Sequence, residues 1–553
     1  MPSKAFLYAH AMVSLRPSQI LWYLLRRGLK VGEGCSTETD FAPVPAGQQP
    51  HSAFLTYPMG AAAPDGFCFL NREKRFDGGI PRWQNPDMPR LWSYNLHYFD
   101  YLQDPALPVA RKQAIIEDWI AENPQGTVTA WEPYTASLRI VNWIKFLTQE
   151  PAAAGTPVLT SLAGQGRWMR HNLELHILAN HFFKNIKALL FAGCYFGHGE
   201  ALEWFQRGCR DLSRELDEQQ LSDGGHYERS PMYHAIFLED LLDILNYCGP
   251  ALADPLRRKL QRAAVSAAVF LRDLRHPNGD FPLFNDAAFG IAPDTQQLLA
   301  YAQDLLGDAL SGQHEVRTAF AESGYFLLGN EQGRMIIDCG ETGPRYQPGH
   351  THCDTLSYEL SIGGQTVVVD TGTLNYEPGD ARKHDRSTAA HNTVVVDGQE
   401  QSEVWGLFRV ARRASPTMVR FDADSRHAHF CGSHDGYRRL KQAVTHQREV
   451  SFDGHSWTLS DLLSGEGEHT LDSYIHFHPA LTASLSADEV TLQDGQGRPV
   501  ARLHITGPAD VMLEPSVYHP RFGIEQANQR LHLHYRGPLP ATLGYRITPA
   551  TGN

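Results

Sequence analysis

The spacing of apolar residues changes character once along this chain, near Gly324. From about residue 108 to 310, apolar residues recur at three- and four-residue steps, as in HILANHFFKNIKALLFAGCYF, which predicts a series of amphipathic helices. The short connectors contain Gly, Pro and Asn, so we expect antiparallel helical hairpins. After Gly324 the apolar runs are short, as in YFLLGN, TVVVDTG and NTVVVDG, with no helix of useful length between them. The change predicts a helical domain followed by an antiparallel β-sandwich.

The length of the chain agrees with two large domains, because 553 residues exceed what one ordinary hydrophobic core supports. We expect the helical domain to span residues 96–322 and the β-sandwich to span residues 323–553. Residues 1–95 are interpreted as an irregular and partly helical lead-in packed on the helical domain, because much of this stretch is rich in Pro and Gly.

The charge and hydropathy of the chain exclude some classes of partner. A formal net charge of -13 argues against a general nucleic-acid binder, which needs a dominant basic field. An anionic ligand therefore requires a local basic pocket. No apolar run approaches the roughly 20 residues that cross a membrane, so we expect no membrane span. The sequence leaves the oligomeric state open.

The first 30 residues contain a short apolar stretch that His10 interrupts, and they lack a clear small-residue cleavage site. They favour an amphipathic helix over residues 19–29, with Arg26 and Arg27 on its outer face. We therefore expect no secretion signal, a cytoplasmic location by default and a periplasmic location as the alternative.

Polar residues at the ends of predicted strands form a candidate metal site. His350 and His352 lie two apart in GHTHCDTLSYEL, so an extended backbone points both side chains the same way. Asp370 ends the run QTVVVD, and His391 opens the run HNTVVVD. Two imidazoles and a carboxylate suit zinc. A hydrogen-bonded cluster of polar strand ends explains the same residues equally well.

Two segments of the helical domain carry more polar residues than packing requires. Asn180 and His181 precede an apolar helix in ANHFFKN, where an N-cap is the simpler interpretation of Asn180. The segment SDGGHYERSPMYH follows a Gly-Gly turn and contains Tyr227, Glu228, Arg229 and Tyr233. Such a group is costly to bury without partners, which favours a cleft. Tyrosines that are half-buried with their hydroxyls at the surface are the alternative.

Two further segments give weaker signals. Asn285 and Asp286 follow a Pro-containing loop in HPNGDFPLFNDAAFG, and a helix or turn cap is the preferred interpretation of Asp286. The aromatic-rich stretches LWSYNLHYFDYL and WEPYTASLRIVNW contain rings that could stack on sugars, although aromatic residues at helical spacing are more often core.

Taken together, ANHFFKN, GGHYERSPMYH, GHTHCDTLSYEL and HNTVVVDGQEQSE resemble the heparinase II/III-like polysaccharide lyases, a group that includes oligoalginate lyases. The resemblance implies an α+β protein with an N-terminal incomplete (α/α) toroid, a following antiparallel β-sandwich and an active-site cleft between them. It also implies β-elimination of a uronic-acid-containing anionic polysaccharide: a glycosaminoglycan, an alginate or a bacterial exopolysaccharide.

The resemblance assigns roles to the matching residues. It implies that Asn180, with the adjacent His181, contacts the uronate carboxylate and that Tyr233 serves as general acid and often as base. His350 matches the group that assists proton transfer or neutralises the carboxylate. Tyr376 is a secondary candidate for substrate contact.

The segment SDGGHYERSPMYH supplies three further substrate-binding candidates: Tyr227, Glu228 and Arg229. A nearby His or Arg, such as Arg229, is expected to lower the pKa of the catalytic Tyr. The resemblance also implies zinc on His352, Asp370 and His391 of the candidate metal site. The metal would be mainly structural, because elimination requires no metal-bound water.

Two other functions use the same residues. A uronate C-5 epimerase removes the same proton but returns it instead of expelling O-4. A non-catalytic glycan-binding protein of polysaccharide biosynthesis would keep the cleft without turnover, although the intact Asn180, Tyr233 and His350 argue against it.

Overall fold

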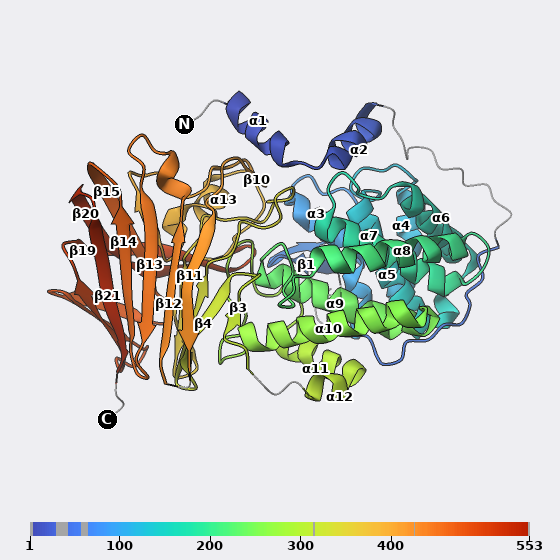
Figure 1. The fold of residues 1–553 in the computed structure, drawn as a ribbon. Coiled ribbons are helices and arrows are strands. Elements are labelled where there is room, and N and C mark those ends of the chain that lie inside the picture. The colour runs from blue at the N-terminus through green and yellow to red at the C-terminus, as the bar shows by residue number, and fades with distance from the viewer. Residues whose placement is uncertain (1–3, 29–41, 57–64, 313–315, 425, 551–553) are drawn as a thin grey trace.

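The computed structural model describes residues 4–28, 42–56, 65–312, 316–424 and 426–550. Figure 1 shows a helical body and a body of sheets side by side, with the N-terminal helices α1 (Lys4–Ser14) and α2 (Pro17–Gly28) along one edge of both. No helix among the described residues is both long and apolar enough to cross a membrane.

The helical body is an incomplete (α/α) toroid of antiparallel hairpins. Its innermost helices are buried on nearly all sides, so their apolar residues are not confined to one stripe. The innermost helices are α5 (Pro133–Gln149), α7 (Ala179–Phe196) and α9 (Pro231–Cys248). Around them lie α3 (Arg90–Tyr98), α4 (Val109–Glu122), α6 (Thr156–His171), α8 (Ala201–Gln219), α10 (Asp254–Leu274), α11 (Thr295–Leu306) and α12 (Asp308–Ser311).

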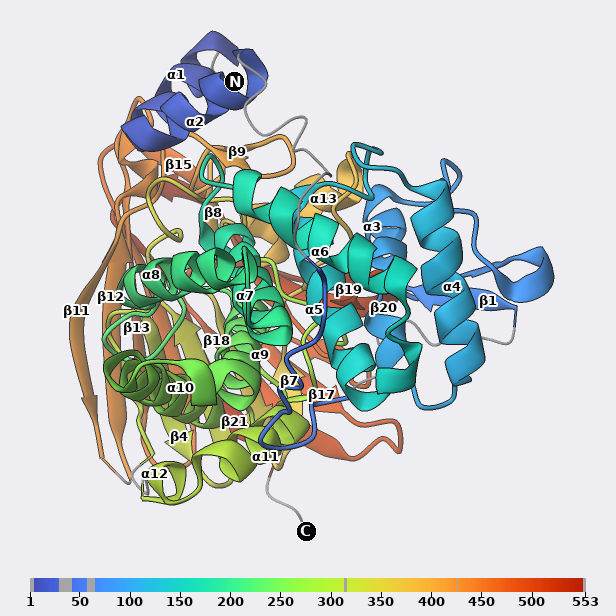
Figure 2. The same ribbon diagram turned by 90° about the vertical axis from the view of Figure 1, so that its right-hand side faces the viewer.

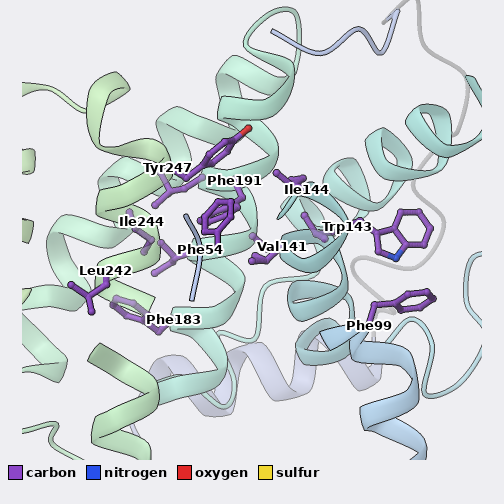
Figure 3. Close-up of a cluster of buried hydrophobic side chains, with 14 of the residues drawn as sticks. Phe54, Phe99, Val141, Trp143, Ile144, Phe183, Phe191, Leu242, Ile244 and Tyr247 are labelled. Carbon is purple, nitrogen blue, oxygen red and sulfur yellow. The ribbon is translucent and has the colours of Figure 1, made fainter. Parts of the chain in front are cut away.

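The lead-in contributes to the core of the toroid. Phe54 inserts between α7 and α9, where its ring lies 6.2 Å from that of Phe191 and 6.1 Å from that of Tyr247 (Figure 3). The short hairpin β1 (Gly66–Phe69) and β2 (Arg72–Arg75) buries Phe67 and Phe69 in the same core. This segment therefore belongs to the folded body of the toroid.

The β-body contains three antiparallel sheets that share one core. A five-stranded sheet adjoins the helices and has the order β3 (Ala319–Phe320), β4 (Tyr325–Asn330), β5 (Gly333–Asp338), β6 (Tyr358–Ile362) and β7 (Gln365–Val368). The strand β3 lies a few residues before the domain boundary expected at residue 323.

The remaining sheets face each other across that core. The eight-stranded sheet has the order β11 (Pro416–Ala423), β12 (Ala428–His434), β13 (Thr445–Phe452), β14 (Trp457–Ser464), β21 (Ala541–Pro549), β18 (Pro499–Thr506), β17 (Glu489–Gln493) and β16 (Thr482–Ser486). The four-stranded sheet has the order β19 (Asp510–Arg521), β20 (Ile524–Pro538), β15 (Glu468–His476) and β8 (Val394–Val396).

Long connections of the β-body reach the toroid. The β5–β6 and β7–β8 connections carry the H-x-H motif, the helix α13 (Asp380–Asp385) and the HNT motif. A small hairpin, β9 (Val404–Trp405) and β10 (Arg409–Val410), follows them. In Figure 2 the toroid helices lie in front of the sheets, with α13 beside α3.

Candidate active site

A cavity of about 580 Å³ lies where the toroid meets these connections. Residues of α3, α5, α7 and α9 form one wall, and the segments around residues 347–350, 376–377 and 407–408 form the other. Five of the residues singled out from the sequence line it: Asn180, His181, Tyr233, His350 and Tyr376. The charges of its lining are mixed: Arg90, Lys145, Lys184 and Lys187 each form an ion pair with a carboxylate. Five carboxylates also line the cavity, namely Asp100, Glu132, Glu174, Glu239 and Glu377, so the local basic pocket that an anionic ligand requires is not formed by these cations.

Asp286 binds several of the polar side chains at and behind the cavity wall. Its carboxylate accepts hydrogen bonds from His350 Nδ1 at 3.0 Å and from His352 Nε2 at 2.9 Å, and it forms a two-pronged ion pair with Arg382 of α13. Burial alone would raise the pKa of Asp286, but Arg382 and the two histidines outweigh it and hold that pKa well below its usual range. The cap expected at Asp286 is therefore wrong, because this side chain binds distant side chains and not its own backbone.

Backbone hydrogen bonds bring the segments that contain Ser230, Asp286 and His350 together. Asn285 has a positive φ of 58°, and its side-chain oxygen accepts from the backbone N–H of His352 at 3.0 Å. The backbone N–H of Asp286 donates to the carbonyl of His350, and its carbonyl accepts from the Ser230 hydroxyl at 2.7 Å. His350 and His352 lie in the β5–β6 connection and not on a strand.

His350 is oriented for proton transfer. Because the ionised Asp286 accepts from Nδ1, the neutral imidazole carries its lone pair on Nε2. Nε2 lies 3.4 Å from the side-chain nitrogen of Asn180, and the ring stacks on Tyr233 with 3.8 Å between centroids. The arrangement places the imidazole against a phenol at the edge of the cavity.

The two cavity tyrosines touch through their hydroxyls. Tyr233 Oη lies 3.4 Å from Tyr376 Oη, and the Arg382 guanidinium carbon lies 4.8 Å from the centre of the Tyr376 ring. Burial raises the pKa of both hydroxyls well above 10. The lowered tyrosine pKa expected from the sequence is not found, because desolvation outweighs the nearby cation. Both groups are therefore neutral phenols that can donate a proton.

Asn180 and His181 lie on the first turn of α7. The residue that caps this helix is Leu178, which makes no side-chain cap bond, so the N-cap interpretation of Asn180 is wrong. The Asn180 amide instead donates to Glu228 at 3.0 Å, and burial raises the pKa of Glu228. His181 Nδ1 pairs with Glu174 at 3.1 Å. Burial would lower the pKa of His181, but Glu174 outweighs it and raises that pKa, which favours a cation at the cavity wall.

Other residues of the polar cluster lie away from the cavity lining. Tyr227 is buried against Tyr346, with 3.1 Å between their hydroxyls. Arg229 donates to the carbonyl of Glu322 at 2.9 Å. Glu228 does not line the cavity but accepts a hydrogen bond from the Asn180 amide at 3.0 Å. The cation beside the tyrosines is Arg382, which the sequence reasoning missed.

The aromatic-rich stretches divide between core and cavity. Trp92 and Phe99 are buried in the toroid, whereas Tyr94, Tyr98 and Tyr134 line the cavity. The Tyr134 ring lies 4.4 Å from that of His181. Helical spacing alone does not separate these two groups.

The candidate metal residues form two hydrogen-bonded pairs that face each other. His352 binds Asp286, His391 Nδ1 binds Asp370 at 2.7 Å, and the two imidazole centroids lie 5.4 Å apart. His352 Nδ1 and His391 Nε2 are buried without a hydrogen-bond partner. Burial lowers the pKa of His352 to about 4, so that imidazole is neutral and can act as a ligand. The two nitrogens left over suit two ligand positions of a metal, with Asp370 orienting His391. Burial would lower the pKa of His391, but Asp370 outweighs it and raises that pKa, so a metal there would compete with a proton.

Among the described residues, the predicted zinc ligands His352, Asp370 and His391 do not bring three potential ligand atoms within 4.8 Å of one another, whereas two different groups do. They are His384 with Asp385 and His519, and Asp472 with His532 and His534. In both groups histidine nitrogens already hydrogen-bond to carboxylates, at 2.7 Å between His519 and Asp385 and at 2.8 Å between His532 and Asp472.

The fold and the cavity define a toroid and β-sandwich protein with a stacked histidine and tyrosine between its two domains. The chain belongs to the heparinase II/III-like family: residues 111–304 match the heparinase II/III N-terminus, and residues 313–548 match Heparinase II/III-like, C-terminal.

Relatives in sequence and structure agree with this family. A heparin-sulfate lyase of Bacteroides stercoris is 24% identical over 405 residues, which cover 65% of this chain and 56% of the relative. The FtsZ-localized protein C of Caulobacter vibrioides is 25% identical and covers 84% of this chain and 83% of that protein. A crystal structure of heparinase III superposes with a TM-score of 0.68 at 18% identity, covering 86% of this chain and 80% of that one. The chain thus spans just over half the length of the first of these relatives.

Proposed function

We propose that this protein is a polysaccharide lyase that cleaves a uronate-containing anionic polysaccharide by β-elimination. The observation that carries the proposal is the stacking of the His350 imidazole, oriented by Asp286, on the neutral Tyr233 phenol at the cavity. The names of the heparin-sulfate lyase relatives favour a glycosaminoglycan as the substrate class.

The residues suit the two proton transfers of the reaction. His350 Nε2 takes the C-5 proton, the electron pair of that C–H bond forms the C4–C5 double bond, and the C4–O4 bond breaks. Tyr233 gives its hydroxyl proton to the departing O-4. The products are an unsaturated uronate end and a free hydroxyl end, and the two side chains return to their starting states by exchange with water.

The carboxylate of the substrate needs stabilisation as negative charge develops next to it. Asn180 and the cationic form of His181 lie on one turn of α7 and meet this requirement with a hydrogen bond and a charge.

Elimination fits this geometry better than epimerisation. An epimerase returns a proton to the opposite face of C-5 and therefore needs donors on both sides of the sugar. Here the two best-placed groups, Tyr233 and His350, stack on each other and lie on one side.

We also propose zinc as a structural group held by His352 and His391, with Asp370 orienting the second imidazole. Bound there, the metal would cross-link the β5–β6 connection to the HNT segment and so support the position of His350. The support for this proposal is the pair of buried ring nitrogens without partners.

An absorbance screen tests the proposed function. Purified protein is incubated with heparan sulfate, chondroitin sulfates, hyaluronan, alginate and bacterial exopolysaccharides, and the ultraviolet signal of the unsaturated uronate is followed. Tyr233→Phe should lower the rate on the active polymer by about 100-fold or more, as the loss of a general acid does. Substrate whose uronate changes configuration without loss of chain length would replace the lyase proposal with the epimerase.

A further inference from the structure

The N-terminal helices α1 and α2 carry an exposed apolar surface that the catalytic proposal does not use. Of the seventeen large hydrophobic side chains exposed in the described residues, eight lie between Phe6 and Leu24. The most exposed of them are Met12 at 56%, Val13 at 75%, Leu21 at 54% and Leu24 at 60%. So dense a group on a folded protein marks an interaction surface.

The opposite faces of the two helices hold them on the body of the protein. Tyr8 lies against Trp405 of β9, with 4.7 Å between ring centroids, and accepts a hydrogen bond from Arg409. Arg16 pairs with Glu218, and the buried Gln19 donates to the carbonyl of Ile177 at 3.3 Å. The helices are therefore docked, and Met12, Val13, Leu21 and Leu24 point away from the docked side.

The charge of this segment is opposite to that of the whole chain. Residues 1–32 contain five Lys or Arg and no Asp or Glu, whereas the formal net charge of the chain is -13. Lys4 and Arg27 are exposed, while Arg26, which the sequence placed on the outer face, contacts His176 of the toroid. A basic segment with large exposed apolar side chains is complementary to an anionic lipid surface.

We propose that α1 and α2 form a peripheral membrane-binding surface that docks this protein on anionic phospholipid. Both helices run along one edge of the molecule, above the junction of the two domains, so they can contact the same plane (Figure 1). The apolar side chains Met12, Val13, Leu21 and Leu24 would enter the headgroup region, and Lys4 and Arg27 would pair with lipid phosphates. Neither helix crosses the bilayer.

Vesicle co-sedimentation of the full chain tests this. Vesicles of phosphatidylcholine with about one third phosphatidylglycerol should pellet the protein, and vesicles of phosphatidylcholine alone should pellet much less, because binding to anionic lipid has a screened electrostatic part. The variant M12S/V13S/L21S/L24S should need at least 10-fold more anionic lipid for half-maximal binding. The charge variant K4E/R27E should lose the difference between the two lipids.

The matched control V109S/V128S/M418S/V419S removes the same number of exposed apolar side chains elsewhere and should bind like wild type. Both quadruple variants should keep the wild-type melting temperature and the wild-type rate on any active polysaccharide, since none of these residues lines the cavity. Wild-type protein that stays in the supernatant with anionic vesicles overturns the proposal. A dimer that the first variant converts to monomer, without vesicle binding, would assign the surface to a second copy of this chain instead.

Discussion

Asp286→Asn is the most informative single change in the active site. The amide replaces the charge that orients His350 Nδ1, His352 Nε2 and Arg382. Because an Asn side chain offers N–H donors as well as an oxygen, His350 can accept at Nδ1 and carry its proton on Nε2, the atom that should take the C-5 proton. Loss of a positioned base costs about 100- to 10,000-fold in rate.

The same substitution also affects stability. Arg382 is buried, and removing the carboxylate leaves its charge without its ion-pair partner, which costs on the order of 3–5 kcal/mol. A matched control is Asp461→Asn, because Asp461 is equally buried and accepts from His446 and Arg448 at 2.8 Å but does not line the cavity. Both variants should lower the melting temperature by similar amounts.

The assay combines the two measurements on each variant. Thermal unfolding gives the loss of stability, and ultraviolet absorbance at a temperature where the protein remains folded gives the turnover number. Only Asp286→Asn should lose turnover. A folded Asp286→Asn protein with turnover within a few-fold of wild type would refute the role of Asp286 in orienting His350.

Three further predictions follow from the cavity. Asn180→Ala should lower turnover by about 100-fold and change KM less, because the amide is expected to act mainly in the transition state; equal changes in both constants would contradict this. The pKa of His181 is raised in the folded protein. The stabilisation that the His181 cation confers is therefore fully present below the ordinary pKa near 6.5, and it is lost as pH rises through the higher pKa of the folded state. KM should therefore rise with pH over that window in the wild type but not in His181→Ala. Elemental analysis should find about one zinc per chain, and His391→Ala should lose it together with some melting temperature; wild-type protein purified without chelators that holds no metal would reduce the site to hydrogen bonds.

The sequence was sufficient for the fold class because apolar periodicity is a local property. The steps of three and four residues that predicted the toroid helices appear in the structure as α4 to α11, and the short runs after Gly324 appear as antiparallel sheets. The same holds for the motifs: Asn180, Tyr233 and His350 were selected from short segments and line one cavity.

Residue roles that depend on long-range contacts were not accessible from the sequence. Asp286 was interpreted as a cap, yet it binds three side chains that lie 64 to 96 residues away in the chain. Arg382 gave no signal, since an Arg in a short polar helix is usually exposed. Arg229 was expected in the cleft but points toward Glu322 instead.

The sequence by itself determined which residue types are present and which local structures they form, because periodicity, turns and motifs act over a few neighbours. Only the tertiary structure decided which polar side chains face the cavity and which support it from behind. The physical reason is that this choice depends on how loops of the sandwich pack against the toroid. There a positive φ at Asn285 and one buried carboxylate orient groups from distant parts of the chain.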